Sequence, residues 1–236
     1  MEFLNRTVLI TGAAGHLGRA VAQRFADHGA SLALLDLAAA GLAQAVPTGL
    51  PPERWLALPT DLLDREQTAQ AVGAALQRFG RIDALINLAG GFAMGEPVHA
   101  TSDQTWDRLF DLNTRTLLNA VRATVPHLLA QRSGKIINVG AASARQGLGQ
   151  MGAYCASKGA VIRLTESMAA ELREQGINVN CVLPTILDTP ANRAAMPEAD
   201  PTRWVAPADL AAVIAFLASD AARAIHGAAL PVSGLS

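Results

Sequence analysis

The chain is poor in the residues that build metal centres and disulfide frameworks. Its 236 residues include only two cysteines and five histidines, and neither type recurs at the spacing of a metal or redox motif. We therefore expect Cys155 and Cys181 to be reduced, packed thiols. For the same reason we expect no bound metal.

Long apolar runs and charge of one sign are equally scarce. The longest mainly apolar stretch, Leu210 to Ala218, is far shorter than the roughly 20 residues that cross a bilayer. The formal net charge is −1 without a cluster of lysine and arginine, so we expect neither nucleic acid nor a membrane surface as partner. An expected strand already begins at Thr7, which leaves no room for a secretion signal. These absences predict a cytoplasmic protein with a small-molecule substrate.

What the sequence does contain is a regular alternation of two hydrophobic patterns. Half of the residues are hydrophobic, and apolar runs of strand length alternate with helical patterns. The expected strands are Thr7–Thr11, Ser31–Asp36, Trp55–Pro59, Ile82–Asn87, Lys135–Val139, Ile177–Val182 and Ala228–Val232. The expected helices are His16–His28, a weak one after Leu37, Asp64–Phe79, Ser102–Gln131, Gly152–Glu174 and Pro207–Ser219.

This alternation predicts one α/β domain over residues 1–236. Right-handed crossovers place each helix over the sheet, so a doubly wound, seven-stranded parallel sheet should carry helices on both faces. The stretch of about residues 184–206 is expected to be a loop over a site.

The first expected strand runs directly into a glycine-rich turn and then a helix. There Gly12 permits a tight turn, Gly15 lets the backbone approach a pyrophosphate, and Gly18 lets helix and strand pack closely. The helix begins with His16 and Leu17, and its N-terminus faces the anion. The turn therefore predicts a Rossmann dinucleotide site; a strand-to-helix turn without a ligand is the alternative.

An acidic side chain at the end of the second expected strand bears on the choice of cofactor. Asp36 stands eighteen residues after Gly18, where a carboxylate accepts hydrogen bonds from the adenine ribose hydroxyls. A 2′-phosphate would meet a like charge there, and Leu37 offers no cation to neutralise it. We therefore expect NAD(H) to be preferred over NADP(H).

Two further strand ends complete the expected cofactor site. Asp61 and Leu62 follow the third strand and can contact the adenine; alternatively, Asp61 only begins the next turn. Ala89, Gly90 and Gly91 follow the fourth strand at the carboxyl edge of the sheet, where such folds bind ligands. Their small side chains suit close contact with a ribose.

The scarcest residue types point to the reaction. Tyr154 is the single tyrosine, and Lys158 is one of two lysines beside 17 arginines. Four residues apart in a helical stretch, both side chains share one face. A lysine charge favours phenolate, so we expect the pKa of Tyr154 to fall by a few units. Tyr154 would then exchange a proton near neutral pH, and Lys158 would also reach the nicotinamide ribose. A surface pair without chemistry is the alternative.

With these motifs the chain resembles the short-chain dehydrogenase/reductase family over essentially its whole length. The matching positions are Thr11–Gly18, Asp36, Asp61, Asn87–Gly90, Asn113, Tyr154–Lys158, Pro184 and Phe216–Ser219. The resemblance implies that Asn113 holds a water that links Lys158 to solvent. It also implies that Pro184 through Thr189 line the nicotinamide, with Thr189 near its carboxamide.

The chain departs from the family pattern at two positions. Ala141 stands thirteen residues before Tyr154, where the family usually has a serine whose hydroxyl binds the substrate carbonyl. Ser143 can take that role only if the loop is displaced. In the glycine-rich turn, His16 stands where a glycine is expected, and Gly15 takes that glycine's place.

At both of these positions the chain resembles the quinonoid dihydropteridine reductase branch of the family. That branch has the same glycine spacing and alanine in place of the serine, and residues 183–193 and 196–200 resemble its loop closely. Asn113 follows the general family instead. Reducing a conjugated pterin ring requires no hydroxyl on a single ketone oxygen. For a simple ketone, loss of that donor costs on the order of 10²-fold in rate.

Three functional hypotheses follow. The first is an NADH-dependent oxidoreductase that transfers hydride to a quinonoid dihydropteridine or a similar conjugated heterocycle, with Tyr154 as proton donor. The second is a short-chain enzyme acting on another carbonyl or a quinone-like substrate. The third is a non-catalytic NAD(H)-binding sensor or scaffold, supported only by Ala141. By resemblance, the helices 102–131 and 152–174 would form a homodimer or homotetramer.

Overall fold

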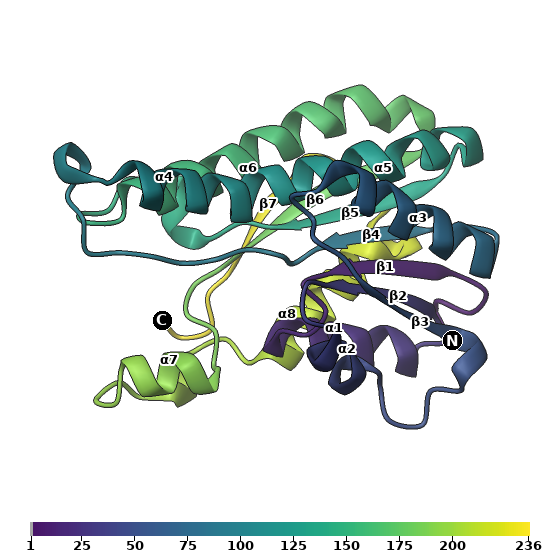
Figure 1. Ribbon diagram of the computed structural model, residues 1–236, viewed down its shortest axis with the longest axis horizontal. Coiled ribbons are helices and arrows are strands. Elements are labelled where there is room, and N and C mark those ends of the chain that lie inside the picture. Colours follow the sequence, from purple (N-terminus) through teal and green to yellow (C-terminus); the bar gives the residue numbers. More distant parts are fainter. Residues whose placement is uncertain (1) are drawn as a thin grey trace.

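The computed structural model describes residues 2–236, in which seven parallel strands form one sheet (Figure 1). The strands are β1 (Thr7–Thr11), β2 (Ser31–Asp36), β3 (Trp55–Pro59), β4 (Ala84–Asn87), β5 (Gly134–Val139), β6 (Ile177–Pro184) and β7 (Ala229–Val232). Their order is β3-β2-β1-β4-β5-β6-β7. The order reverses between β1 and β4, and ligands of such sheets bind beyond the carboxyl ends of the strands at this point. The predicted fold class is confirmed.

Helices cover both faces of the sheet, as the alternation predicts. They are α1 (His16–Asp27), α2 (Ala39–Ala45), α3 (Arg65–Phe79), α4 (Asp103–Phe110), α5 (Thr116–Gln131), α6 (Gly152–Leu172), α7 (Pro190–Ala195) and α8 (Pro207–Ala218). Figure 1 shows α1, α2 and α8 on one side of the sheet and α3, α5 and α6 on the other.

The two cores are built by alternate residues of the same strands. In β1, Val8 and Ile10 pack with residues of α1 and α8, whereas Leu9 between them packs with residues of α3, α5 and α6. Successive side chains of a strand point to opposite faces. Because both faces are buried, the strands are mainly apolar on both sides, which is why length rather than alternation revealed them.

The expected helix over residues 102–131 is present from Asp103 to Gln131, but a π-turn interrupts its regular α-helical bonding. The structure has α4, then a π-helical turn over Asp111–Arg115, and then α5. A π-turn adds a residue to the helical ladder and is common at functional sites. Here it carries Asn113, whose side chain is 1% exposed. Hydrophobic periodicity gives no signal for such a turn, because the apolar pattern continues on both sides of it.

The segment expected to be a loop over residues 184–206 contains α7 and a short 3₁₀ turn over Pro201–Arg203. Its two ends are tied by a backbone bridge between Leu187 and Val205. Thr189 caps α7 by accepting a hydrogen bond from Asn192 N at 3.2 Å. Figure 1 shows this segment standing apart from the sheet, near the carboxyl terminus of the chain.

Among residues 2–236, no helix combines the length and the apolar character that a membrane span needs. The same residues include no group of three or more histidine, cysteine, aspartate or glutamate side chains arranged to hold a metal ion.

Candidate active site

The glycine-rich turn connects the end of β1 to the start of α1 through backbone contacts that exclude side chains. Gly12 has a φ of +66°, and a Cβ there would lie 2.8 Å from Ala89 N. A Cβ on Gly18 would lie 2.3 Å from Gly12 O. Gly15 is the N-cap of α1 and brings no side-chain hydrogen bond to it, so the first backbone N–H groups of the helix lack a side-chain partner. The turn therefore fits the pyrophosphate of a dinucleotide.

Asp36 is held against this turn by hydrogen bonds from the backbone. Its Oδ2 accepts from Ala14 N at 3.0 Å and its Oδ1 from Ala38 N at 3.3 Å. The carboxylate thus lies at the carboxyl edge of the sheet beside the phosphate-binding turn, where the sequence placed it. Its role in choosing between NAD(H) and NADP(H) remains a prediction.

The two other strand ends lie at the same edge. Asp61 accepts a hydrogen bond from Leu63 N at 2.9 Å and so forms the turn that the alternative interpretation gave it; its contact with adenine stays a prediction. Leu62 beside it is 7% exposed. A residue that received no role, Thr11, joins β1 to the fourth strand end: its Oγ1 accepts from Leu88 N at 3.1 Å and from Ala89 N at 3.3 Å.

Tyr154 and Lys158 lie in the first turns of α6, one helical turn apart. Lys158 is 6% exposed, and its Nζ donates to Val139 O at 2.9 Å. Burial lowers the pKa of this ammonium to about 8. Burial also raises the pKa of Tyr154 to about 12, so the expected fall of that pKa is wrong. The cost of a buried phenolate outweighs the lysine charge, which is directed at a backbone carbonyl.

The raised pKa keeps the Tyr154 phenol protonated at neutral pH, which is the state that a proton donor needs. Phe92 packs edge-to-face on its ring, with the centroids 4.9 Å apart. The sequence analysis gave Phe92 no role, although an aromatic residue directly after Ala89–Gly91 was the available signal.

Asn113 is brought to the same place by the π-turn. Its Nδ2 donates to Gly91 O and to Ser157 Oγ, both at 3.0 Å, and its Oδ1 accepts from Gly91 N at 2.9 Å. Ser157 in turn donates to Tyr154 O at 2.9 Å, a role that the sequence analysis missed. Asn113 therefore fixes the strand end beyond β4 against the first turns of α6. Its contact with a water remains a prediction.

Gly90 lies between the two polar side chains. A Cβ at this position would be 2.8 Å from Asn113 Oδ1 and 3.1 Å from Lys158 Nζ. Small size at residue 90 is therefore required by the positions of the Asn113 and Lys158 side chains. The sequence analysis had assigned the glycine to a ribose contact, and that role stays a prediction.

Two buried asparagine side chains and a buried threonine form a series of hydrogen bonds near the site. Asn87 Nδ2 donates to Asn138 Oδ1 at 2.9 Å, and Asn138 Nδ2 donates to Thr165 Oγ1 at 2.9 Å. The two asparagines are register partners at the ends of β4 and β5. The sequence analysis gave these residues no structural role. The available signal was a polar residue at the carboxyl end of each of two apolar strands.

Comparison with known proteins identifies the family. Residues 6–200 match the profile of the short chain dehydrogenase family. A meso-2,3-butanediol dehydrogenase of Serratia marcescens is 34% identical over 242 residues, covering 99% of this chain and 95% of that protein.

The chain belongs to the short-chain dehydrogenase/reductase family. Two solved structures of relatives match it closely. The structure of levodione reductase has a TM-score of 0.91 at 31% identity and covers 98% of this chain and 97% of its own. That of the 3-ketoacyl-(acyl-carrier-protein) reductase from Brucella melitensis, complexed with NADH, has a TM-score of 0.88 at 30% identity and covers 98% of each chain. The chain is therefore an oxidoreductase of a family that uses a nicotinamide cofactor.

This short-chain dehydrogenase/reductase has an alanine, Ala141, where the family usually has the serine that binds the substrate carbonyl. Ala141 follows β5, is 5% exposed and has an extended backbone with φ −157° and ψ 150°. Ser143 is half-buried in the 3₁₀ turn over Ala142–Arg145 that follows it. A carbonyl-binding role for Ser143 stays a prediction.

The predicted nicotinamide-lining residues lie at the end of β6 and in the segment that follows it. Pro184 is the last residue of β6, next to Val232 of β7 in the sheet. Thr189 stands five residues further, at the N-cap of α7. Their contacts with the nicotinamide stay predictions. Trp204, in the same segment, is only 8% exposed.

Proposed function

We propose that this enzyme interconverts a small carbonyl compound and its alcohol, with NAD(H) preferred over NADP(H). The observation that carries the proposal is a phenol, Tyr154, kept protonated by burial and held one helical turn from a buried ammonium, Lys158. A bound nicotinamide supplies or accepts the hydride. The names of the relatives, a butanediol dehydrogenase and a levodione reductase, support a carbonyl substrate better than a pterin.

In this proposal Tyr154 donates its proton to the substrate oxygen during reduction. The Lys158 ammonium lies within the same buried region and supplies positive charge that stabilises the phenolate left behind. Asn113 and Ser157 keep the first turns of α6 at a fixed distance from the strand end that carries Gly90. The chain thus orients the proton donor by packing and hydrogen bonds.

Because residue 141 is an alanine, this proposal has to account for a missing hydrogen-bond donor to the substrate carbonyl. A carbonyl oxygen receives one hydrogen bond from Tyr154, and the second donor has to come from Ser143 or from the substrate's own neighbouring hydroxyl. A substrate with a hydroxyl next to the reacting carbon, as in a vicinal diol or the α-hydroxyketone formed from it, meets that need without a serine at residue 141.

A quinonoid dihydropterin is the second candidate substrate, and Ala141 is the observation that favours it. The exposed Phe92 ring beside Tyr154 offers a face on which a flat heterocycle can stack. None of the relatives named above is a dihydropteridine reductase. A non-catalytic sensor has no support beyond Ala141.

The assembly proposed is a homodimer or homotetramer built on α4, α5 and α6. Trp106 on α4 is 45% exposed and stacks on Phe110 with the centroids 4.6 Å apart. A large exposed tryptophan packed beside a half-buried phenylalanine is typical of a contact surface.

The deciding experiment is steady-state kinetics of the purified enzyme with NADH and NADPH. The panel contains an α-hydroxyketone, a simple methyl ketone and a quinonoid dihydropterin generated in the cuvette, with its uncatalysed reduction subtracted. We expect the α-hydroxyketone to be reduced fastest, with NADH. Fast pterin reduction without carbonyl reduction would replace the first candidate by the second.

A variant and a binding measurement test the role of the phenol. Tyr154→Phe should bind NADH as the wild type does, measured by fluorescence titration, and lose turnover by at least about 10²-fold. Tyr154→Phe with unchanged turnover would remove Tyr154 from the mechanism.

A further inference from the structure

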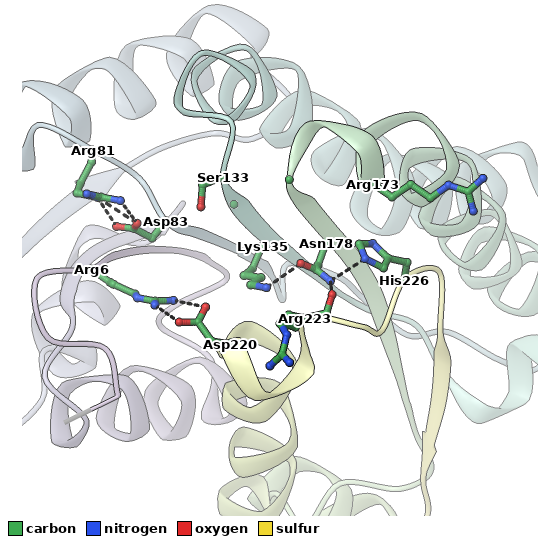
Figure 2. A pocket seen from close by; sticks show the side chains of 12 residues that line it. Arg6, Arg81, Asp83, Ser133, Lys135, Arg173, Asn178, Asp220, Arg223 and His226 are labelled. Carbon is green, nitrogen blue, oxygen red and sulfur yellow. Dashed lines mark hydrogen bonds and ion pairs between the residues drawn. The ribbon is translucent and has the colours of Figure 1, made fainter.

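A second cavity lies at the amino edge of the sheet, at the opposite end from the glycine-rich turn. It has a volume of about 380 Å³ and lies where β5 and β6 begin (Figure 2). Lys135 stands near the start of β5 and Asn178 near the start of β6, whereas the phosphate-binding turn and Tyr154 lie beyond the carboxyl ends of the strands. The length of the sheet therefore separates this cavity from the active site.

Positive charge is concentrated in the cavity walls. The cationic side chains are those of Arg6, Arg81, Lys135, Arg173 and Arg223, and the walls contain two carboxylates. The cavity therefore has three positive charges in excess, although the whole chain has a formal net charge of −1. Such a local excess of positive charge attracts anions.

The two carboxylates are already used by two of the arginines. Arg6 binds Asp220 through both terminal nitrogens. Arg81 binds Asp83 through Nε and one terminal nitrogen, with the shortest contact at 2.6 Å. Lys135, Arg173 and Arg223 form no ion pair with any carboxylate of residues 2–236.

Lys135 is the central cation of the cavity. It is 9% exposed, and its Nζ donates to Asn178 Oδ1 at 2.7 Å. Figure 2 shows it between Asn178 and the Arg6–Asp220 ion pair. An ammonium has three protons to donate, and in the described part of the chain this is the one hydrogen bond that the Lys135 ammonium makes. A buried ammonium with a single neutral partner is costly, so a further acceptor in the cavity would stabilise it.

Asn178 holds that arrangement in place. It is 4% exposed, and its Nδ2 donates to Arg223 O and to Ile225 O, both at 2.9 Å. These two bonds turn its carbonyl oxygen toward Lys135, and they tie the loop of Arg223 to the floor of the cavity. Lys135 is therefore positioned by buried hydrogen bonds, whereas Arg173 and Arg223 are exposed.

We infer that this cavity binds a small oxyanion with two or more negative charges, such as pyrophosphate or a polycarboxylate. Guanidinium forks and an ammonium are the groups that bind such oxygens best. The volume lies near the lower end of the range for small-molecule pockets. The walls contain no apolar aromatic ring to hold a base or a lipid chain, so the ligand is recognised by charge.

The test is calorimetric titration of pyrophosphate into the enzyme saturated with NADH. NADH is needed because the glycine-rich turn itself fits pyrophosphate, and ionic strength is held constant with sodium chloride. We expect saturable binding of one pyrophosphate per chain. The variant Arg173→Gln/Arg223→Gln should weaken it by at least about tenfold, the equivalent of one charge-assisted hydrogen bond.

A matched variant controls for charge. Arg24→Gln/Arg122→Gln removes the same charge from exposed helix positions outside the cavity and should leave the affinity within about twofold of the wild type, since long-range effects are screened. Lys135→Met, with its fold checked by circular dichroism, should abolish binding. A parallel titration with citrate separates the sources: equal affinities support a general polyanion site, and selectivity for pyrophosphate supports a phosphate site.

Three results would overturn the inference. They are the absence of saturable binding, binding that disappears when NADH is present, and equal loss of affinity in the two double variants. Each would leave the cations as a structural cluster only. None depends on which substrate the active site takes, so failure here and failure of the proposed function remain distinguishable.

Discussion

Gly90 lies directly against Asn113: a Cβ on Gly90 would come within 2.8 Å of Asn113 Oδ1. That is closer than real Cβ contacts allow, and Lys158 Nζ stands at 3.1 Å on another side. Gly90→Ala should therefore displace Asn113 and the lysine, lowering kcat by at least about tenfold and the free energy of unfolding by about 1–3 kcal/mol.

Gly73 in α3 is the matched control for that substitution. It is exposed, and a Cβ there would meet no atom within 4 Å. Gly73→Ala should raise the free energy of unfolding by about 0.5–1 kcal/mol, because alanine favours the helix, and leave kcat unchanged. Equal kinetics of Gly90→Ala and wild type would show that residue 90 does not position the catalytic groups.

We expect Lys158 to lower the free energy of unfolding, although the enzyme needs it for activity. Its pKa falls from 10.5 to about 8 because burial disfavours the charged form. Replacing it by methionine removes that cost, offset by the lost bond to Val139 O, so Lys158→Met should be more stable at pH 7 by roughly 1–2 kcal/mol. It should have no activity.

The stability difference should depend on pH in one direction. Below pH 8 the folded protein has to bury the charged ammonium, so the advantage of Lys158→Met is complete there. Between pH 8 and 10.5 the folded wild type loses this proton while the unfolded chain keeps it, and the difference should vanish. Urea unfolding at pH 7, 9 and 10.5 measures this; a difference that grows with pH would contradict it.

Ala141→Ser discriminates between the two candidate substrates. The extended backbone at residue 141 accepts serine without strain, and its hydroxyl would restore the usual carbonyl donor. If the substrate is a carbonyl, kcat/KM for a simple ketone should rise by about 10- to 100-fold. If it is a pterin, pterin reduction should not rise. Ala142→Ser is the neighbouring control.

Asp36→Asn tests the choice of cofactor. It removes the negative charge at the end of β2 and keeps an oxygen that can accept from Ala14 N. The ratio of kcat/KM for NADPH to that for NADH should rise by about tenfold or more, because a 2′-phosphate no longer meets a like charge. Asp61→Asn should change the ratio less. An unchanged ratio in Asp36→Asn would refute the proposed preference for NAD(H).

Trp106→Glu tests the proposed assembly. A carboxylate on the exposed face of α4 should shift the mass in solution from oligomer toward monomer, as light scattering at micromolar concentration measures. Leu4→Glu changes another exposed apolar side chain, 59% exposed and outside these helices, and should not. A wild-type protein that is already monomeric would refute the assembly.

Much of the fold and part of the site followed from the sequence. All seven strands were predicted to within two residues at each end, because buried strands are short apolar runs bounded by turn residues. The glycine-rich turn, Asp36 and the Tyr154–Lys158 pair were found because each depends on spacing within one segment. Local spacing determines which side chains share a turn or a helical face.

Only the tertiary structure decided what depends on contacts between distant segments. The π-turn that carries Asn113, the Ser157 link and the Asn87–Asn138 pair join elements far apart in the chain. The direction of the Tyr154 pKa was also beyond the sequence, because spacing reveals a neighbouring charge but not the degree of burial that opposes it. The cationic cavity likewise exists only because the sheet brings the starts of β5 and β6 and the ends of several loops together.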